Sequence, residues 1–306
     1  MNIGVFGRTR YLLDSVEKLH NEGHKIKFIY TCKAEKYYDK KEIDFQKLAQ
    51  KIGCKFFYGL DISKNLKFIE KLDVDVCISF NWLNIIKKEI LNKFKYGILN
   101  LHVGDLPRYK GNACPNWAIL NFEKKIGITL FKMTEALDSG PIIKKLFFKI
   151  NKKTYITEVY KWIDNVTPKI YLDSINKIHK IKPVQQNKKI KTLRCYPRKP
   201  FDSKINWNDT SLNILALIRA SSLPFDGAFT FLNENKNHKV KIFKASKYKV
   251  NFEANYINGQ VCFFKNNKII VGCSDGFIIL ENYKLNNFSE KKSFKLICHS
   301  LRNRLT

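Results

Sequence analysis

Three polar residues near the middle of the chain are of types that could do chemistry together. Asn100 and His102 lie two residues apart at the end of an apolar run, so in a strand their side chains share one face. Asp138 precedes Ser139 and Gly140, a pattern typical of a turn, which can aim its carboxylate back toward His102. These three residues are therefore the candidate catalytic group.

A carboxamide, an imidazole and a carboxylate together suit acyl transfer to an amine. The reaction passes through a tetrahedral oxyanion, which an amide or imidazole N–H can stabilise. An imidazole can also move the proton that the attacking amine loses, and a neighbouring carboxylate orients the ring. Such a site needs no nucleophilic Ser or Cys. On spacing alone, an Asn-x-His strand and an Asp-Ser-Gly turn are more often plain structure than catalytic.

The elements that must position these residues alternate in type through the first half of the chain. Apolar runs typical of strands cover residues 2–6, 25–31, 55–58, 74–80 and 96–102. Helical spacing covers the segments between them, at residues 11–22, 42–52, 66–71 and 85–94. This alternation predicts an α/β fold with a mainly parallel sheet and helices on both faces. Ligands then bind at the carboxyl ends of the strands, where Asn100 and His102 lie.

A change in composition predicts a second domain. Residues 182–210 are polar and contain Pro183, Pro197 and Pro200, which indicates a linker after a catalytic domain of residues 1–181. Residues 211–306 begin with a helical segment and continue as short strands separated by turns such as Asn258-Gly259. Regular short strands favour a small C-terminal barrel.

Composition narrows the class of protein. The formal net charge is +29, but the Lys residues are spread along the whole chain, which favours compositional bias over a nucleic-acid surface; an anionic partner stays the alternative. No apolar run has the length of a membrane span, and the N-terminus reads as a core strand, so we expect a cytoplasmic protein without a membrane partner. Eight scattered Cys without C-x-x-C spacing predict neither a metal site nor a disulfide scaffold.

Several ordered segments resemble one enzyme family. Leu99–His102, Leu106–Gly111, Gly127–Thr129 and Leu137–Ile142 together resemble the folate-dependent formyltransferases. That family includes methionyl-tRNA formyltransferase, glycinamide ribonucleotide formyltransferase and the sugar-nucleotide N-formyltransferases. Residues 194–207 and 224–228 resemble the start of the C-terminal domain of the tRNA and sugar branches, which the glycinamide branch lacks. The resemblance implies a Rossmann-like catalytic domain followed by an OB-like β-barrel.

The resemblance also implies residue roles. Asn100, His102 and Asp138 match the family's catalytic residues, and the implied formyl donor is N10-formyltetrahydrofolate, with no metal. The reduced folate is expected on the loop after residue 80 and on the turn around residue 138, at Phe80, Trp82, Leu83, Ile85, Leu137, Ser139 and Gly140. One departure stands out. The family usually has Ser before its Leu-Leu-Pro motif, whereas this chain has Val103-Gly104-Asp105.

The acceptor is less closely defined. The segment of residues 31–42 is short and mixed in charge, unlike the basic insertion that the tRNA branch uses, so a nucleic-acid partner is not favoured. The sugar branch implies a dTDP-, GDP- or UDP-linked amino deoxysugar as acceptor, made for a bacterial surface glycan such as the O-antigen of lipopolysaccharide. Methionyl-tRNA formyltransferase stays the alternative. The resemblance also implies a homodimer through the barrel domain.

Cationic residues predict where the acceptor binds. Arg8, Thr9 and Arg10 follow the first strand and open a helix, so they could face a diphosphate; a solvated turn is an equal alternative. Lys110 and Asn112 are weaker candidates for acceptor contacts.

Overall fold

The computed structural model describes residues 1–36, 38–266 and 268–306. Tyr37, in the segment weighed above for RNA binding, and Asn267, in an expected turn, lie outside the described residues. The described chain forms two compact units. The first contains residues 1–114, 126–148 and 160–195, and the second contains residues 115–125, 149–159 and 196–306. The units therefore interleave along the chain, and the last change from one to the other falls inside the expected linker.

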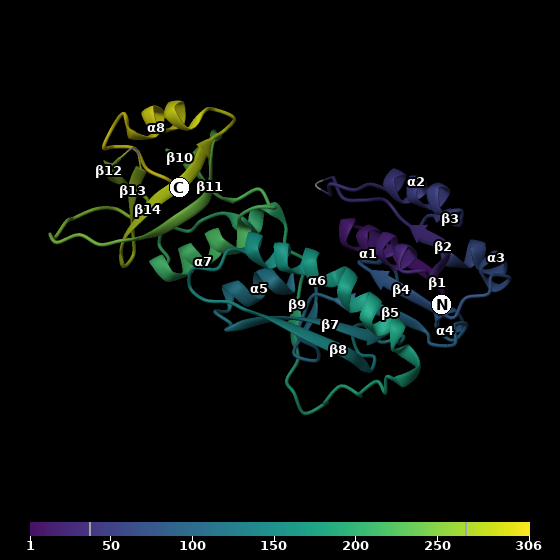
Figure 1. The fold of residues 1–306 in the computed structure, drawn as a ribbon. Coiled ribbons are helices and arrows are strands. Elements are labelled where there is room, and N and C mark those ends of the chain that lie inside the picture. Colours follow the sequence, from purple (N-terminus) through teal and green to yellow (C-terminus); the bar gives the residue numbers. More distant parts are fainter. Residues whose placement is uncertain (37, 267) are drawn as a thin grey trace. The chain divides into compact units, whose positions relative to one another are not determined.

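The first unit is built on a mostly parallel sheet, as predicted. Its strands are β1 (Asn2–Gly7), β2 (Lys25–Thr31), β3 (Lys55–Tyr58), β4 (Val76–Phe80), β5 (Ile98–His102), β7 (Lys125–Lys132) and β8 (Ile142–Lys149). In the part of the chain that the structure describes, they form one seven-stranded sheet in the order β3-β2-β1-β4-β5-β7-β8 (Figure 1). The strands from β3 to β5 are parallel, and β7 runs antiparallel to β5.

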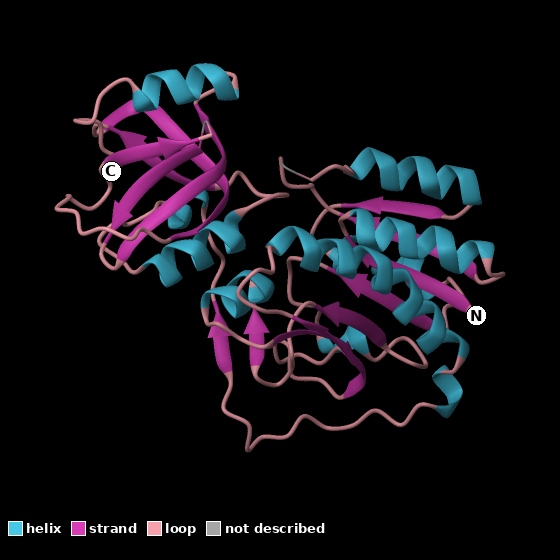
Figure 2. Cartoon of the chain, turned by 60° about the vertical axis from the view of Figure 1, so that its left-hand side comes forward, coloured by secondary structure: helices cyan, strands magenta, loops and turns pink. Residues whose placement is uncertain are grey.

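Helices flank the strands of this sheet (Figure 2). Phe6, Phe28 and Cys77 line one face and form a core with Ile69 and Ile90, from the two short helices α3 and α4. Helix α1 buries its own apolar side chains, including those at positions 12, 13, 16 and 19. The helices of residues 1–181 are α1 (Arg10–Asn21), α2 (Glu42–Ile52), α3 (Leu66–Glu70), α4 (Lys88–Leu91), α5 (Cys114–Leu120) and α6 (Ile156–Asn176), with 3-10 turns at Ile62–Asn65 and Ile178–Lys180.

The helix expected over residues 85–94 is wrong for most of its length, because only Lys88–Leu91 are helical. Asn81 has a φ of +54° directly after β4, and the side chain of Asn84 donates to the Leu60 carbonyl oxygen at 3.2 Å. These features hold residues 81–87 as a loop at the carboxyl end of β4.

The first part of the expected linker packs on the first unit. Strand β9 (Leu193–Cys195) pairs in parallel with the short strand β6 (Tyr109–Gly111). Nearer the start of the segment, Val184 forms an antiparallel bridge with Ile142 of β8. A chain that looks like a connector in sequence therefore lines the region of the candidate catalytic residues.

The second unit is an antiparallel β structure, as predicted for the C-terminal part. Its sheet has the order β10-β11-β14-β13-β12 among the described residues. The buried side chains of Trp207, Ile218, Val240 and Leu280 belong to its apolar core. The elements are a 3-10 turn at Pro200–Ser203, α7 (Ser211–Ser221), β10 (Ala228–Leu232), β11 (Asn235–Tyr248), β12 (Val261–Lys265), β13 (Lys268–Cys273), β14 (Gly276–Leu285) and α8 (Glu290–Cys298). Within the described residues, no helix has both the length and the apolar character needed to cross a membrane.

Candidate active site

The candidate site lies at the carboxyl end of β5, as predicted. Asn100 pairs with Ser79 of β4 on one side and with Phe131 of β7 on the other, and His102 pairs with Thr129. His102 is 8% exposed and Asn100 is half-buried. Because the strand is held on both sides, the two side chains are fixed on one face of the sheet.

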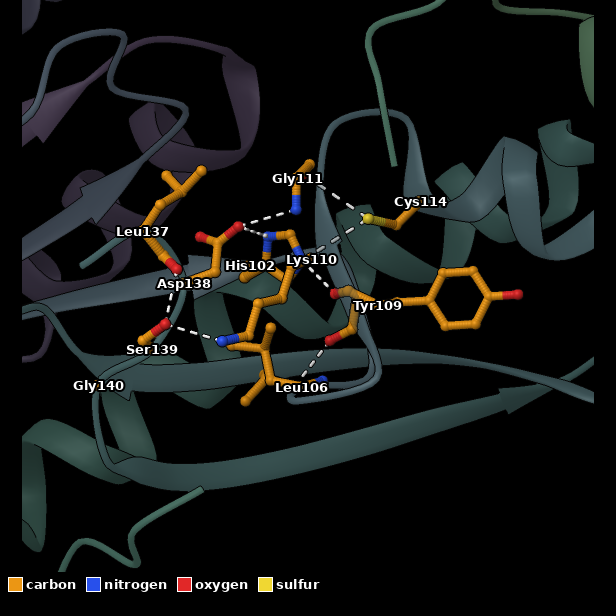
Figure 3. Close-up of polar contacts among 12 residues, drawn as sticks. His102, Leu106, Tyr109, Lys110, Gly111, Cys114, Leu137, Asp138, Ser139 and Gly140 are labelled. Atoms are coloured by element: carbon orange, nitrogen blue, oxygen red, sulfur yellow. Dashed lines mark hydrogen bonds and ion pairs between the residues drawn. The ribbon is translucent and has the colours of Figure 1, made fainter. Parts of the chain in front are cut away.

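The hydrogen bonds of the His102 ring decide which nitrogen can exchange a proton. Nε2 lies 2.8 Å from the Tyr109 carbonyl oxygen, which can only accept, so Nε2 carries a hydrogen (Figure 3). Nδ1 faces the Asp138 carboxylate, with 3.9 Å between Nδ1 and Oδ2. Nδ1 is therefore the ring nitrogen left to exchange a proton, and it faces a carboxylate.

Asp138 is presented by the turn between β7 and β8. Its φ is +47°, a left-handed conformation that Asp tolerates better than most residues, and it is 8% exposed. The backbone N–H of Gly111 donates to Asp138 Oδ2 at 2.9 Å. The neighbouring Ser139 hydroxyl donates to the Leu137 carbonyl oxygen at 2.8 Å and accepts from Lys110 Nζ at 2.7 Å. Strand β6 and the turn therefore hold the carboxylate from two sides.

The carboxamide of Asn100 is the third group. Among the described residues, no protein atom forms a hydrogen bond with this carboxamide. An amide N–H without a protein partner, on the same face as the imidazole, can stabilise a developing oxyanion.

Gly104 belongs to the segment that departs from the family pattern, and it lies directly against the His102 ring. A Cβ at this position would lie 2.3 Å from His102 Nε2 and 2.5 Å from the Tyr109 carbonyl oxygen. Thr129 fixes the Gly104 backbone, because its hydroxyl donates to the Gly104 carbonyl oxygen at 2.7 Å. In this chain, glycine leaves the space that the imidazole and its carbonyl acceptor occupy.

Cys114, which the sequence analysis did not select, lies beside the imidazole. Its Sγ is 3.7 Å from His102 Nε2. A hydrogen bond with the Cys195 thiol, burial and the charge of Asp138 all raise the pKa of the Cys114 thiol. A thiol that stays protonated is a poor nucleophile, so the site fits transfer without a covalent cysteine intermediate. No sequence spacing signals this contact, because it depends on the turn after β6.

The residues predicted to hold folate fall into two groups, one buried in the core and one exposed. Phe80 is 6% exposed, and the Trp82 ring packs edge-on to Phe6 and Tyr30 with centroid distances of 5.8 and 5.5 Å. Trp82 is therefore part of the core at this position. Leu83 and Ile85, on the loop after β4, and Leu137, on the turn that carries Asp138, are instead 51%, 75% and 52% exposed. Exposed apolar side chains at this edge can receive a flat ring. Ser139 and Gly140 lie in the Asp138 turn.

The two arginines of the predicted phosphate-binding turn form hydrogen bonds and ion pairs with other residues of this chain. Arg8 is 5% exposed, and its guanidinium donates to the Lys33 carbonyl oxygen at 2.8 Å and to Glu35 Oε1 at 3.2 Å. Arg10 pairs with Asp164 at 2.6 Å and with Asp39 at 3.4 Å. Thr9 lies between them with a φ of +92° and a buried hydroxyl that has no partner among the described residues. A diphosphate at this turn would have to replace these carboxylates, so the predicted role stays a prediction.

The remaining two candidates lie on or beside β6. Lys110 contacts the Asp138 turn through Ser139, as described above. Asn112 is exposed, and its backbone N–H donates to the Cys195 carbonyl oxygen at 2.9 Å. Contact of these two side chains with an acceptor stays a prediction. No group of three or more His, Cys, Asp or Glu among the described residues is arranged to hold a metal ion.

The fold and these contacts define an α/β protein with an imidazole, a carboxylate and a carboxamide at the carboxyl edge of its sheet. A formyl transferase family model matches residues 1–175, and a formyl transferase C-terminal domain model matches residues 198–293. The chain therefore belongs to the formyl transferase family and is a formyltransferase, as the sequence resemblance implied.

Individual relatives differ in what they act on. The chain is 32% identical over 269 residues to the bifunctional polymyxin resistance protein ArnA of Wigglesworthia glossinidia brevipalpis, which covers 81% of this chain but 39% of that longer protein. It is 27% identical over 303 residues to the methionyl-tRNA formyltransferase of Orientia tsutsugamushi, covering 97% and 96% of the two chains. An N-formyltransferase from Helicobacter canadensis, solved with folinic acid and dTDP-3-aminofucose, shares the fold with a TM-score of 0.66, 22% identity and coverage of 91% and 98%.

Proposed function

We propose that this formyltransferase moves a formyl group from N10-formyltetrahydrofolate to the amine of a nucleotide-linked amino deoxysugar. The observation that carries the chemistry is the placement of His102, with Nε2 on the Tyr109 carbonyl oxygen and Nδ1 toward Asp138. The partner-free Asn100 carboxamide on the same face completes the group.

In the proposed reaction, the acceptor amine attacks the formyl carbon and a tetrahedral oxyanion forms. The Asn100 carboxamide donates an N–H to that oxyanion. His102 takes the amine proton at Nδ1, and the resulting imidazolium is stabilised by Asp138 before the proton passes to the departing nitrogen. The Tyr109 carbonyl oxygen fixes the ring by accepting from Nε2, which therefore does not take part in the transfer.

The proposed folate site uses the exposed apolar side chains of Leu83, Ile85 and Leu137 at the same edge of the sheet. Main-chain groups of the Asp138 turn are close enough to the catalytic group to hold the polar edge of a pterin beside it. The relatives support this assignment, because the Helicobacter canadensis protein was solved with folinic acid.

The segment after β2 favours a small acceptor over tRNA. Residues 31–42 contain four Lys and three acidic residues, a net charge of only +1. Glu35 and Asp39 of this segment are paired with Arg8 and Arg10, and Lys41 Nζ donates to the carbonyl oxygens of Glu35 and Lys36 at 2.7 and 2.9 Å. A segment with a net charge of only +1, held by these contacts, offers little to a phosphate backbone.

Methionyl-tRNA formyltransferase is the second candidate function. The observation that favours it is full-length similarity, at 27% identity, to the Orientia tsutsugamushi methionyl-tRNA formyltransferase. It predicts tRNA binding that weakens steeply as salt concentration rises, which a sugar-nucleotide enzyme lacks.

The direct test supplies the purified protein with N10-formyltetrahydrofolate and, in parallel, dTDP-, GDP- and UDP-linked amino deoxysugars or methionyl-tRNA. Mass spectrometry of the acceptor should detect an N-formyl sugar nucleotide, and His102→Ala should reduce its formation by about 100-fold or more. His238→Ala, at an exposed histidine of the second unit, is the matched control and should keep full turnover. Formylation of methionyl-tRNA alone would reject the proposed acceptor and establish the second candidate.

A further inference from the structure

The side chain of Gln186 spans the turn that carries the proposed catalytic carboxylate. Its Nε2 donates to the Asp138 carbonyl oxygen at 3.0 Å and to the Gly140 carbonyl oxygen at 2.8 Å. A carboxamide nitrogen has two hydrogens, so both are used on backbone carbonyls two residues apart. Gln186 belongs to the segment of residues 182–210, which the sequence predicts to be a linker. It is not one of the candidate site residues.

The carboxamide oxygen of Gln186 shows that the two hydrogen bonds from Nε2 determine the orientation of the carboxamide. Gln186 Oε1 is buried and has no hydrogen-bond partner among the described residues. A buried acceptor without a partner is energetically unfavourable. Turning the amide over would instead point Oε1 at two carbonyl oxygens, which repel it. The side chain therefore keeps the orientation in which its nitrogen holds the turn.

The turn has reason to be held. Asp138 is in a left-handed conformation, which is less favourable for an L-residue than the right-handed one. On one side the turn packs closely on β7, because a Cβ at Gly140 would lie 1.8 Å from the Lys132 carbonyl oxygen. Gln186 supplies hydrogen bonds to the two carbonyl groups that flank Ser139.

The position of Gln186 is itself fixed by backbone pairing. Two residues earlier, Val184 and Ile142 exchange hydrogen bonds of 2.7 and 2.8 Å between their backbone N–H and carbonyl groups. Nine residues later, Cys195 pairs with Gly111, whose N–H donates to the Asp138 carboxylate. One crossing segment therefore supports the backbone of Asp138 through Gln186 and its carboxylate through β6.

We propose that Gln186 is a positioning residue, which holds the Asp138 turn so that the carboxylate faces His102 Nδ1. This inference rests on the proposed catalytic role of Asp138. Gln186 touches the backbone of the turn and takes no part in the chemical step, so its loss should lower kcat through Asp138 and leave the acceptor KM nearly unchanged, whereas the folate KM should rise because the same turn belongs to the proposed folate site.

The test measures kcat and both KM values for Gln186→Met, which keeps the shape of the side chain and removes its donors, and for Gln186→Ala. We expect kcat to fall about tenfold, with a change in the acceptor KM below about threefold, because a small misplacement of a catalytic group is felt strongly in the rate. Gln185→Ala, at the exposed neighbouring residue, is the matched control and should match wild type. Melting temperatures confirm that each variant is folded. If Gln186→Ala does not fold, the result for Gln186→Met decides the test.

A double-mutant cycle then separates positioning from general damage. In an Asp138→Asn background, Gln186→Met should cost little further activity, because the group it positions is already gone. Wild-type kcat in Gln186→Met, or losses that simply multiply in the double variant, would overturn the proposal while leaving the Asp138 assignment intact. Full activity of Asp138→Asn alone would overturn the catalytic assignment and this inference together.

Discussion

The other residues of the candidate site are arranged around the imidazole ring of His102. Its Nε2 is bonded to a carbonyl oxygen, so only Nδ1 is free to exchange a proton, and the carboxylate that faces Nδ1 comes from a left-handed turn. Gly104 and Gly111 make the close approaches possible on either side. At this scale, substitutions of single residues change turnover by removing or moving the Asp138 carboxylate.

Asp138→Asn should lower kcat by about 100-fold while the melting temperature stays unchanged. Asn tolerates the left-handed conformation, and its side-chain oxygen can still accept from the Gly111 N–H, but it has no charge to stabilise the imidazolium. Steady-state kinetics and thermal denaturation check the two halves of this prediction. A variant with wild-type kcat would show that the carboxylate charge is dispensable.

Gly111→Ala should damage both the site and its support. Gly111 has a φ of +97°, and a Cβ there would lie 2.3 Å from the Cys195 carbonyl oxygen. The strand pair β6–β9 must then shift and move the N–H away from Asp138, so we expect kcat to fall about tenfold and stability to drop by about 1–3 kcal/mol. Gly53→Ala is the control: it has a φ of +73° but open space around it, so it should cost stability alone. Equal kcat in both variants would contradict the role of the β6 backbone.

The elements show which parts of the fold sequence patterns could predict. The parallel strands β1 and β4 come from nearly continuous apolar runs, which identify buried strands well. The pairing of β6 with β9 could not be predicted, because each strand is three residues long and the second lies in a polar segment with prolines. Asn100, His102 and Asp138 are recognisable by residue type and motif, whereas Gln186 and the carbonyl of Tyr109 act through tertiary contacts that leave no local pattern.

At the element scale, Asp275 ties the start of α7 to the β13–β14 turn. Its carboxylate accepts from the Ser211 backbone N–H at 2.6 Å and from the Ser211 hydroxyl at 2.9 Å. Burial alone would raise the pKa of Asp275, but the hydrogen bonds from Ser211, together with Lys247, outweigh it and lower the pKa to about 2. The ionised form is therefore favoured in the folded protein.

Asp275→Ala should destabilise the protein by about 1 kcal/mol at neutral pH, the usual cost of removing such a helix-start acceptor. Because the folded pKa lies below the unfolded value of about 3.9, this contribution is fully present above pH of about 4 and is lost as pH falls toward 2. Chemical denaturation at several pH values measures it. Asp226→Ala, whose side chain is 77% exposed, is the control and should show almost no effect. A wild-type–variant difference that grows on acidification would refute the assignment.

At the scale of the whole molecule, the two units share their sequence in an interleaved way. Residues 149–159 belong to the second unit, where Arg219 Nη1 donates to the Asn151 carbonyl oxygen at 3.1 Å and the Tyr155 hydroxyl donates to the Ala245 carbonyl oxygen at 3.2 Å. The change in composition predicts the change of domain at residues 182–210, but composition does not reveal earlier segments that return to a later core. The expected homodimer stays a prediction that sedimentation analysis can check.

A fragment of residues 1–195 should therefore be less stable than the full chain. It keeps the candidate catalytic group but leaves Tyr155, which packs against the core of the second unit and donates to the Ala245 carbonyl oxygen, without the partners that follow residue 195. We expect a lower melting temperature and increased binding of a hydrophobic dye such as ANS, which reports exposed apolar surface. The full chain is the reference for both measurements. Equal melting temperatures and dye binding would show that the first unit is self-sufficient when cut there.

The left-handed turn at position 138 has a consequence for natural variation. Codons for Asp and Asn differ at a single base, and Asn is among the residues that such a turn accepts most readily. A single transition mutation can therefore produce the Asp138→Asn protein, which should fold normally and reach normal abundance but catalyse the reaction poorly. Screens that rank alleles by protein abundance or thermal resistance would pass it as normal, so only a measurement of product reveals it.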